Sequence, residues 1–537
     1  MQRVFVDSID WERVVLIING HVEPAGSTAP VRLHVEDTRT GLVIQIPDAV
    51  PETDGTFTVR FKIMQANELM PLDVGEWMLF AEDGLMREPV AMGADFALDV
   101  VGYPGMFSSV YRYWVFPARE PMTGQFYLAV NYRGVIPPVP ETPLEAIKMA
   151  LSRHLRQWRQ DAYQVVYGVV RAIVPKNGKR ILFTSDSRDH LSGNLLHIYE
   201  RMQERGLDRE YKMMGAFKGS IADKRGLLDK FTFAAKLAVA DVVIMDDYHP
   251  MTYKVDYDEG VRRIQVWHAS GAFKTVGYSR IGKPGGPNPF SPGHKNYTHA
   301  IVAAEHDVPF YAEAYGIPEE RVIPTGIPRL DLFFDEAYKT NTRNLVYETV
   351  PQIRDRYVIL FAPTFRGEGP RDAYYDYDQL DLPALYALCE EMDAVVVFKM
   401  HPFVIEPLPI PAEYADRFID ATKSREINEF LMVADLAITD YSSLVFEYSI
   451  LDRPMLFFAY DLEEYISTRD FYEPFEEFVP GRIVRTFGEM LDAIRSRDFE
   501  QEKVHAFAQT HLGHLGQLEG GSTDRVIDQL ILGRGEA

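Results

Sequence analysis

The first 135 residues alternate apolar and polar side chains over short runs, which glycine, proline and Asp-Gly turns separate. Alternation with a period of two is typical of strands that bury one face. We therefore predict an N-terminal β-rich domain over residues 1–135, with the architecture of a sandwich or a small barrel. Its strands are predicted at residues 14–18, 56–63, 77–81 and 126–131.

Residues 136–180 form a different kind of segment. The run VIPPVPETP at residues 135–143 predicts a stiff linker, because clustered prolines favour an extended chain. Beyond it, residues 144–180 hold eight basic and two acidic side chains, a local net charge of +6, and their apolar positions are spaced along one helical face. These positions are Ile147, Leu151, Leu155, Trp158, Val166 and Val169, with Tyr163 at the edge of the face.

A basic amphipathic helix of this kind has two interpretations. It can lie on an anionic membrane surface, where its charges meet lipid headgroups and its apolar face meets acyl chains. It can also bridge two domains with a solvated basic face. The sequence favours neither interpretation over the other.

From residue 181 onwards the pattern alternates between strand and helix, in two series. The strands are predicted at residues 181–184, 212–216, 241–245, 264–267 and 299–303, and then at 358–362, 395–398, 436–439 and 455–458. The segments ADVVIMD at 240–246 and ADLAITD at 434–440 echo each other. This alternation predicts an α/β fold with parallel sheets covered by helices. We expect two Rossmann-like domains facing a cleft, at residues 181–340 and 341–537.

Composition narrows the class of protein. A chain of 537 residues with 46% hydrophobic content is expected to hold about three domains. Cys389 is the single cysteine, so no intrachain disulfide forms, and the first residues lack the pattern of a secretory signal; we expect a cytoplasmic protein. No apolar run is long enough to predict a membrane span. The net charge of −23 argues against nucleic acid as a partner, and an anionic ligand therefore needs a local basic cluster.

Two predicted strands end in a histidine and a lysine. The run IQVWHASGAFK at 264–274 carries His268 and Lys274, and VVVFKMHP at 395–402 carries Lys399 and His401. Ligands of open parallel sheets bind beyond the carboxyl ends of the strands, so all four side chains are candidates for one cleft. A single histidine is more often a core or surface residue than a functional one. Two with the same placement favour a site.

Phosphate-binding signals accompany these strand ends. In TDYSSLVFEYSI at 439–450, Ser442 and Ser443 fall where a strand gives way to a helix, whose free backbone N–H groups attract anions. Glu447 is then placed to accept hydrogen bonds from the ribose of a nucleotide. Each signal is weak alone, because every α/β domain has such junctions.

Two further runs add cationic groups to the predicted site. FAPTFR at 361–366 ends a strand with Thr364 and Arg366, and a guanidinium there is suited to grip a diphosphate by its planar fork. GIPRLD adds Arg329 in a turn between the two halves. Any one basic residue is more often a surface charge than a ligand.

The acidic triplets of the chain do not predict a metal site. Asp256 and Asp258, like Asp376 and Asp378, form D-x-D patterns, but 79 acidic residues produce such triplets freely and neither pair follows a predicted strand directly. We assign no metal ligands and no cofactor.

Six runs give a specific resemblance. VWHASGAFKTVGYSR, TGIPRLD, FAPTFRG, FKMHPF, TDYSSLVFEY and RDFYEPFEEFVPG resemble the CDP-glycerol glycerophosphotransferase family of teichoic-acid enzymes over about residues 180–515, and FVDSIDWERV at the start resembles its ribitol-phosphate polymerase branch. The resemblance implies a GT-B-type fold of two Rossmann-like domains, peripheral attachment to the inner membrane face, and transfer of an alditol phosphate from a CDP-alditol. It also implies that His268 and His401 are the two essential histidines of the family, and that Arg366, Ser442, Ser443 and Glu447 bind the donor.

The predicted reaction is attack by the terminal hydroxyl of a lipid-linked poly(alditol phosphate) chain on the outer phosphorus of CDP-ribitol, with release of CMP. His268 is expected to act as general base, while His401, Lys399 and Arg366 stabilise the diphosphate charge. The alternatives are CDP-glycerol as donor, a glycosyltransferase that uses a nucleotide sugar, and a non-catalytic scaffold at the membrane. The expected location is the cytoplasmic face of the membrane, with the primer, an anionic lipid surface and a homo-oligomer as candidate partners.

Overall fold

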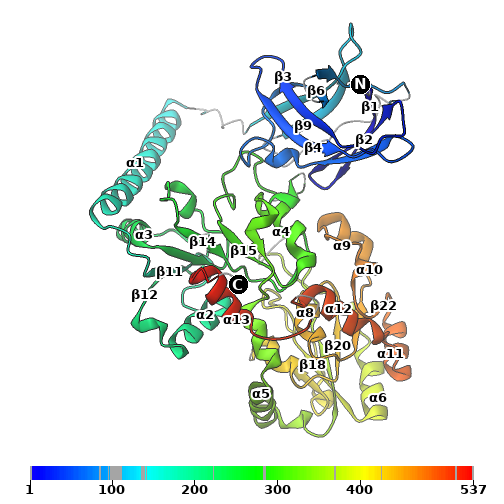
Figure 1. Ribbon diagram of the computed structural model, residues 1–537. Helices are drawn as coiled ribbons and strands as arrows, with labels where there is room; N and C mark the ends of the chain where they lie inside the picture. The colour runs from blue at the N-terminus through cyan, green and yellow to red at the C-terminus, as the bar shows by residue number, and fades with distance from the viewer. Residues whose placement is uncertain are drawn as a thin grey trace.

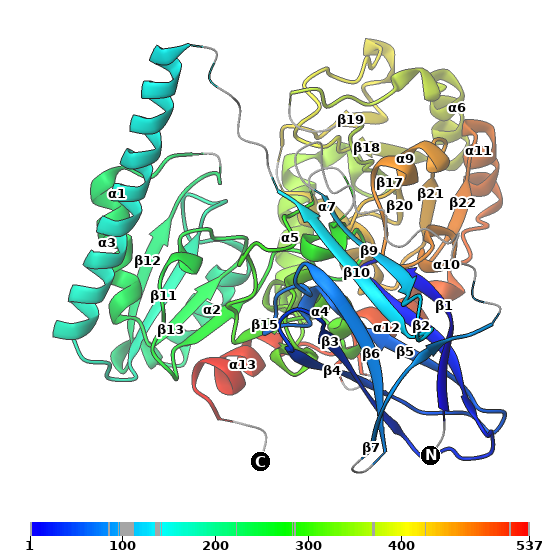
Figure 2. The same ribbon diagram turned by 90° about the horizontal axis from the view of Figure 1, so that it is seen from above.

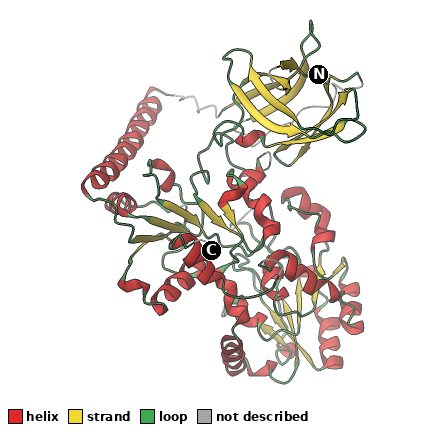
Figure 3. Cartoon of the chain, viewed as in Figure 1, coloured by secondary structure: helices red, strands yellow, loops and turns green. Residues whose placement is uncertain are grey.

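The computed structural model describes residues 3–534, apart from 84–85, 95, 97–111, 135–139, 141, 222, 282, 284–285, 368–370, 425 and 515–516 (Figure 1). Most of the predicted proline-rich linker lies outside the described residues. The chain forms a region built mainly of strands, with the short 3-10 helix Ile63–Gln65, at the N-terminal end; we call it the N-terminal β unit, and two regions of mixed helix and strand follow it (Figure 3). We call these the first and second α/β units, and the surface where they meet is the junction.

The N-terminal β unit holds two sheets of mainly antiparallel strands. One has the order β5-β2-β1-β8 and the other the order β4-β3-β6-β10-β9, with β7 paired to β6. The buried side chains Leu16, Val35 and Trp77 belong to the one core of this unit. The strands are β1 (Arg3–Glu12), β2 (Val15–Glu23), β3 (Val31–Asp37), β4 (Val43–Ala49), β5 (Thr56–Phe61), β6 (Gly75–Asp83), β7 (Met86–Pro89), β8 (Ala91–Met92), β9 (Arg112–Arg119) and β10 (Phe126–Arg133).

The helix α1 (Pro143–Ile173) follows the N-terminal β unit. Thr142 and Glu145 form a capping box that starts it. Tyr163 and Tyr167 are buried against the first α/β unit, and the N-terminal half of the helix projects beyond that unit (Figure 2). Large apolar side chains along the helix are exposed to solvent, namely Leu144, Ile147, Leu151, Leu155, Trp158, Val165, Val169 and Ile173.

The first α/β unit is built on a parallel sheet of order β12-β11-β13-β14-β15-β16. Ile181 and Phe183 of β11 point into one core, whereas Leu182 between them belongs to another, so both faces of the sheet are covered. The strands are β11 (Arg180–Ser185), β12 (Lys212–Phe217), β13 (Val242–Met245), β14 (Arg262–Gln265), β15 (His299–Ile301) and β16 (Val322–Ile323). The helices are α2 (Gly193–Glu204), α3 (Leu227–Val239) and α4 (Val308–Tyr315).

The second α/β unit repeats this plan with the order β19-β18-β17-β20-β21-β22, again parallel. The prediction of an α/β fold with parallel sheets is therefore confirmed. The strands are β17 (Tyr357–Phe361), β18 (Ala394–Phe398), β19 (Phe418–Asp420), β20 (Leu436–Thr439), β21 (Met455–Phe458) and β22 (Arg482–Val484). The helices are α5 (Glu336–Thr349), α6 (Leu382–Met392), α7 (Ile427–Leu431), α8 (Leu444–Ser449), α9 (Leu462–Thr468), α10 (Phe475–Phe478), α11 (Phe487–Ser496) and α12 (Glu502–Leu512).

Three predicted strands end two residues earlier than expected, at Phe61, Gln265 and Ile301, and the second of these ends moves a candidate residue. The strand expected at 264–267 ends at Gln265, because the Gln265 side chain accepts a hydrogen bond from the backbone N–H of Trp267 at 2.9 Å and the chain turns there. Trp267 has a φ of 42°, in the left-handed region that bulky residues rarely adopt. His268 therefore lies on a loop rather than at the strand end itself.

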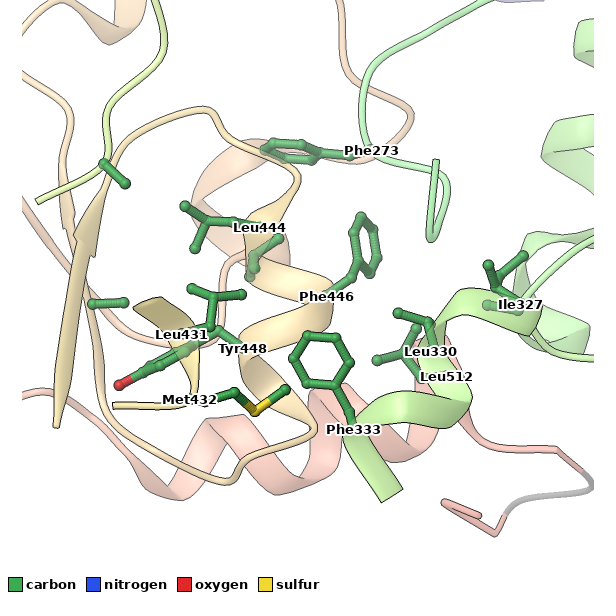
Figure 4. Close-up of a cluster of buried hydrophobic side chains, with 14 of the residues drawn as sticks. Phe273, Ile327, Leu330, Phe333, Leu431, Met432, Leu444, Phe446, Tyr448 and Leu512 are labelled. Atoms are coloured by element: carbon green, nitrogen blue, oxygen red, sulfur yellow. The ribbon is translucent and has the colours of Figure 1, made fainter. Parts of the chain in front are cut away.

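The two α/β units share one apolar core across the junction. Figure 4 shows Phe446 of α8, in the second unit, between Phe273 and Phe333 of the first. The chain also returns to the first unit at its C-terminal end, where α13 (Ser522–Arg525) contacts α2 through an ion pair of Arg201 and Asp524 at 2.8 Å. The junction is thus apolar at its centre and carries ion pairs at its edge.

Candidate active site

The loop that follows β14 brings His268 to the junction. Small residues allow this loop to pass close to α8: a Cβ added at Gly271 would lie 2.3 Å from a ring carbon of Phe446, so glycine is needed there. The side chain of His268 is 45% exposed. The sequence ASGAF thus places a histidine at the surface while the loop that carries it is packed.

His268 is surrounded by charges of both signs. Its Nδ1 lies 3.8 Å from a carboxylate oxygen of Asp247, which follows β13. Desolvation lowers the pKa of His268, Asp247 opposes this effect, and the cations Arg188 and Arg329 lower the pKa further. The imidazole is therefore neutral at physiological pH and able to accept a proton.

His401 lies beyond the end of β18, and its tautomer is fixed by the backbone. Its Nδ1 accepts a hydrogen bond from the backbone N–H of Phe403 at 3.2 Å, so the proton of the neutral ring is on Nε2. Desolvation first, and then the positive charges of Lys274 and Arg469, lower the pKa of His401. A neutral ring with Nε2–H acts as a hydrogen-bond donor.

Lys274 crosses the junction towards His401. Its Nζ donates to the Tyr465 hydroxyl at 2.8 Å, and the backbone of residue 274 bridges to Phe471 of the second unit. Arg469 donates to the same hydroxyl at 3.4 Å. The prediction missed Arg469, although it begins the run RDFYEPF; nothing in its local sequence distinguishes it from a surface arginine. Lys274 and Arg469 form a cationic group drawn from both units, and the neutral ring of His401 lies beside it.

Arg366 and Thr364 take partners that differ from the predicted diphosphate. Arg366 is only 7% exposed, and each of its guanidinium nitrogens bonds to a carboxylate, of Asp440 at 2.9 Å or of Asp461. Thr364 donates its backbone N–H and its hydroxyl to Asp440 at 2.8 and 2.9 Å. These residues form a buried frame beneath the start of α8. Their ion pairs and hydrogen bonds engage the guanidinium and hydroxyl groups that were expected to bind substrate.

Lys399 is likewise held by the protein. Its ammonium donates to the carbonyl oxygens of Ala421 at 2.9 Å and Thr422 at 3.2 Å, and also to that of Ser424. Lys399 therefore fixes the loop after β19, and its contact with the diphosphate stays a prediction.

Ser442 and Ser443 lie where the sequence placed them, directly before α8. Ser442 accepts a hydrogen bond from the backbone N–H of Leu444 at 3.3 Å, and Ser443 is exposed and makes no side-chain cap. Both hydroxyls lie at the start of the helix, in reach of solvent.

Glu447 and Arg329 join the two α/β units. Glu447 is 4% exposed and accepts hydrogen bonds from the Ser270 hydroxyl at 2.6 Å and from Arg329. The backbone N–H of Arg329 is held by Asn194 of α2 at 3.1 Å. Glu447 is thus occupied by the His268 loop, where the sequence had predicted a ribose; its second oxygen is buried and has no partner among the described residues.

The chain is similar to a known protein family and to teichoic-acid polymerases of two bacteria. The protein family described as CDP-Glycerol:Poly(glycerophosphate) glycerophosphotransferase matches residues 166–532. The chain is 46% identical over 373 residues to teichoic acid ribitol-phosphate polymerase TarL of Staphylococcus aureus, covering 70% of this chain and 66% of the relative. It is 40% identical over 380 residues to the teichoic acid poly(ribitol-phosphate) polymerase of Bacillus spizizenii, covering 71% and 60%. The chain thus matches less than two thirds of the length of either relative.

The fold also matches a solved structure. The wall teichoic acid polymerase TagF superimposes with a TM-score of 0.56 at 22% identity, over 72% of this chain and 96% of that one. The α/β architecture is therefore shared with TagF.

Proposed function

The chain belongs to the CDP-glycerol:poly(glycerophosphate) glycerophosphotransferase family, and we propose that it is a teichoic-acid polymerase. It transfers ribitol phosphate from CDP-ribitol to the hydroxyl end of a lipid-linked poly(alditol phosphate) chain and releases CMP. The observation that carries this proposal is the pairing of a neutral, half-exposed His268 with the cationic group of Lys274 and Arg469, beside His401, at the same junction. The likeness to ribitol-phosphate polymerases favours ribitol over glycerol as the transferred alditol.

In the proposed reaction His268 takes the proton of the acceptor hydroxyl as that oxygen attacks the phosphorus of the ribitol phosphate group. Asp247 stabilises the imidazolium that forms. The new P–O bond replaces the bond to the β–α bridging oxygen, which leaves with its electron pair on CMP. The cationic group then meets the negative charge that develops on the leaving phosphate.

The diphosphate of the donor is proposed to lie between the start of α8 and the cationic group. Ser442 and Ser443 supply hydroxyls there, and His401 donates from Nε2. Arg366 and Thr364 support this surface from below through Asp440, and Lys399 supports it through the loop after β19.

The transfer is proposed to need no cofactor, since CDP-ribitol is a substrate. Phosphoryl transfer relies on positioning and on charge stabilisation, and the side chains of the junction supply positive charge.

We infer that the two α/β units form a GT-B-type pair facing a cleft. The strand order of the second sheet, with the first strand of the unit in the middle, is that of a Rossmann-like domain and supports this assignment. The two sheets of the N-terminal β unit support a sandwich. The domain limits stay those predicted from the sequence, at residues 135, 180 and 340.

The exposed apolar side chains of α1, with arginines beside them, support attachment to an anionic membrane surface at its cytoplasmic face. Within the described part of the chain, no helix has the length and apolar character of a membrane span. Packing of Tyr163 and Tyr167 on the first unit is also what an interdomain helix requires, so both interpretations persist for the C-terminal half of α1. A homo-oligomer stays a prediction.

An assay with purified protein, a lipid-linked primer and either CDP-ribitol or CDP-glycerol tests the function. We expect CMP release and a polymer richer in ribitol phosphate when both donors are supplied at equal concentration. An excess of glycerol phosphate would make the chain a glycerophosphotransferase. Release of a nucleoside diphosphate from a nucleotide sugar would show a glycosyltransferase, and no turnover with any donor would show a scaffold.

A further inference from the structure

Four titratable side chains from three distant segments meet at the edge of the junction. His306 and Asp307 precede α4, Glu473 follows α9, and His511 lies on α12. His306 Nδ1 is 3.3 Å from Asp307 and its Nε2 is 3.5 Å from Glu473. One ligand atom each from His306, Asp307 and His511 lies within 4.8 Å of the others.

The burial of this cluster is unusual for a set of polar groups. Asp307 is fully buried and His511 is only 6% exposed. The Nδ1 of His511 and the second carboxylate oxygen of Glu473 are buried and have no hydrogen-bond partner among the described residues. A buried polar atom without a hydrogen-bond partner destabilises the folded state, so a ligand that satisfies such atoms would stabilise the fold.

We propose that His306, Asp307 and His511 bind one divalent transition-metal ion of the Zn²⁺ class. Two imidazoles and one carboxylate, with water completing the coordination, form a donor set that this class of ion accepts, and a separation of a few ångströms between donor atoms suits a tetrahedral site. The cluster is separate from the acidic D-x-D triplets, and its members are too far apart in sequence to form a recognisable motif.

The ion would have a structural role. A carboxylate oxygen of Asp307 accepts the backbone N–H of Ala272 at 3.2 Å, in the loop that carries His268. One residue further along, Phe273 accepts the backbone N–H of Tyr472 at 3.0 Å, next to Glu473. The ion would therefore fasten the His268 loop to α12 of the second α/β unit through His511. It touches no proposed substrate group, so this inference does not depend on the proposed function.

Equilibrium dialysis of the untagged, chelator-treated protein against Zn²⁺ tests the proposal, with bound metal measured by mass spectrometry and the Tm measured in parallel. We expect one zinc per chain and a higher Tm with zinc. Substituted Co²⁺ should give the visible absorption of a tetrahedral site. His511→Phe keeps an aromatic ring against Phe478 and Phe507, and His306→Asn keeps a polar group; each should weaken zinc binding about tenfold or more.

His505→Gln is the matched control, because His505 is an exposed histidine on the same helix. It should bind zinc as the parent does. Absence of stoichiometric zinc in the folded parent, or equal zinc binding by the parent, His511→Phe and His306→Asn, would overturn the proposal. The cluster would then be an ion pair network, in which Asp307 and Glu473 raise the pKa of His306 to about 9.

Discussion

The hydroxyl of Ser270 donates to Glu447 at 2.6 Å, and this bond joins the two α/β units two residues after His268. Glu447 lies on α8, whose start carries Ser442 and Ser443. Glu447 thus connects the His268 loop to α8, and a shift of this loop is expected to move the start of α8, where the proposed phosphate site lies.

This link gives a first prediction for Glu447→Gln, which keeps the shape of the side chain but removes its charge from Arg329. We expect a loss of about 1–3 kcal/mol in the free energy of unfolding and a lower rate, with the affinity for CDP nearly unchanged. Denaturant unfolding and calorimetry with CDP measure both quantities. Ser270→Ala, the milder variant, should lose about 1 kcal/mol. A large loss of CDP affinity in Glu447→Gln would instead support the predicted contact between Glu447 and the ribose.

His268→Ala should separate catalysis from donor binding. Removal of a general base costs about 10²- to 10⁴-fold in rate, while a base on the acceptor side need not touch CDP-ribitol. Single-turnover kinetics and calorimetry compare the two. His401→Ala is the contrasting variant and should weaken CDP-ribitol binding as well as the rate. Equal losses of affinity in both variants would contradict the roles assigned to them.

The pH dependence of the rate should follow the charges around His268. A general base works when neutral, so activity falls as the pH drops through its pKa, and the lowered pKa places this acid limb below the ordinary histidine value of 6.5. Asp247→Asn removes a charge that raises the pKa and should move the limb to lower pH. Arg188→Gln removes one that lowers it and should move the limb to higher pH. Profiles of kcat/KM against pH measure these shifts. If the acid limb moved in the same direction in both variants, His268 would be excluded as the titrating group.

Arg366→Ala should lower the stability of the fold, because Arg366 holds a buried ion pair. The substitution leaves the buried Asp440 and the partly buried Asp461 without their cation, and breaking a buried ion pair such as that of Arg366 with Asp440 costs about 3–5 kcal/mol. Arg482→Ala breaks the exposed pair with Asp498 and, as the matched control, should cost about 0–1 kcal/mol. Thermal unfolding compares the two variants. If Arg366→Ala and Arg482→Ala were equally stable and only Arg366→Ala lost CDP-ribitol binding, the result would support the predicted contact between Arg366 and the diphosphate.

The helix α1 can be tested by charge reversal. Replacing Arg153, Arg156 and Arg159 with glutamate turns the local net charge of residues 144–180 from +6 to zero, and basic residues near an anionic surface contribute roughly 1 kcal/mol each. The variant should leave anionic vesicles in a sedimentation assay and keep its activity on a short soluble acceptor. Neutral vesicles are the control for apolar binding. Sedimentation equal to that of the parent would make α1 an interdomain helix only.

In the two α/β units the sequence predicted the longer strands well, including the edge strand β12, and missed three short edge strands. Strands β17, β18, β20 and β21 were placed within one residue, because continuous buried runs such as VVVF have few alternatives in a parallel sheet. The edge strands β16, β19 and β22 span two or three residues and were missed, since so short a run carries no period.

At the site, too, features that a local stretch of sequence carries were predicted, and contacts between distant residues were not. His268 and His401 were predicted because each follows a strand in sequence, and both lie beyond a strand of a parallel sheet. The partners of Arg366 and Glu447 were not, because Asp461 lies 95 residues from Arg366 and Ser270 lies 177 residues from Glu447. A local motif indicates that a charge matters but does not reveal which distant group neutralises it.

The apolar core at the junction also restricts domain motion. Domains of one chain swing on a hinge when a small polar surface separates them. Here Phe273 stacks on Phe478 with ring centroids 5.0 Å apart, and the chain that leaves the first unit before α5 returns to it at α13. Opening would expose these rings to water, so the apolar contact opposes separation of the two units and favours a site assembled before the substrates arrive.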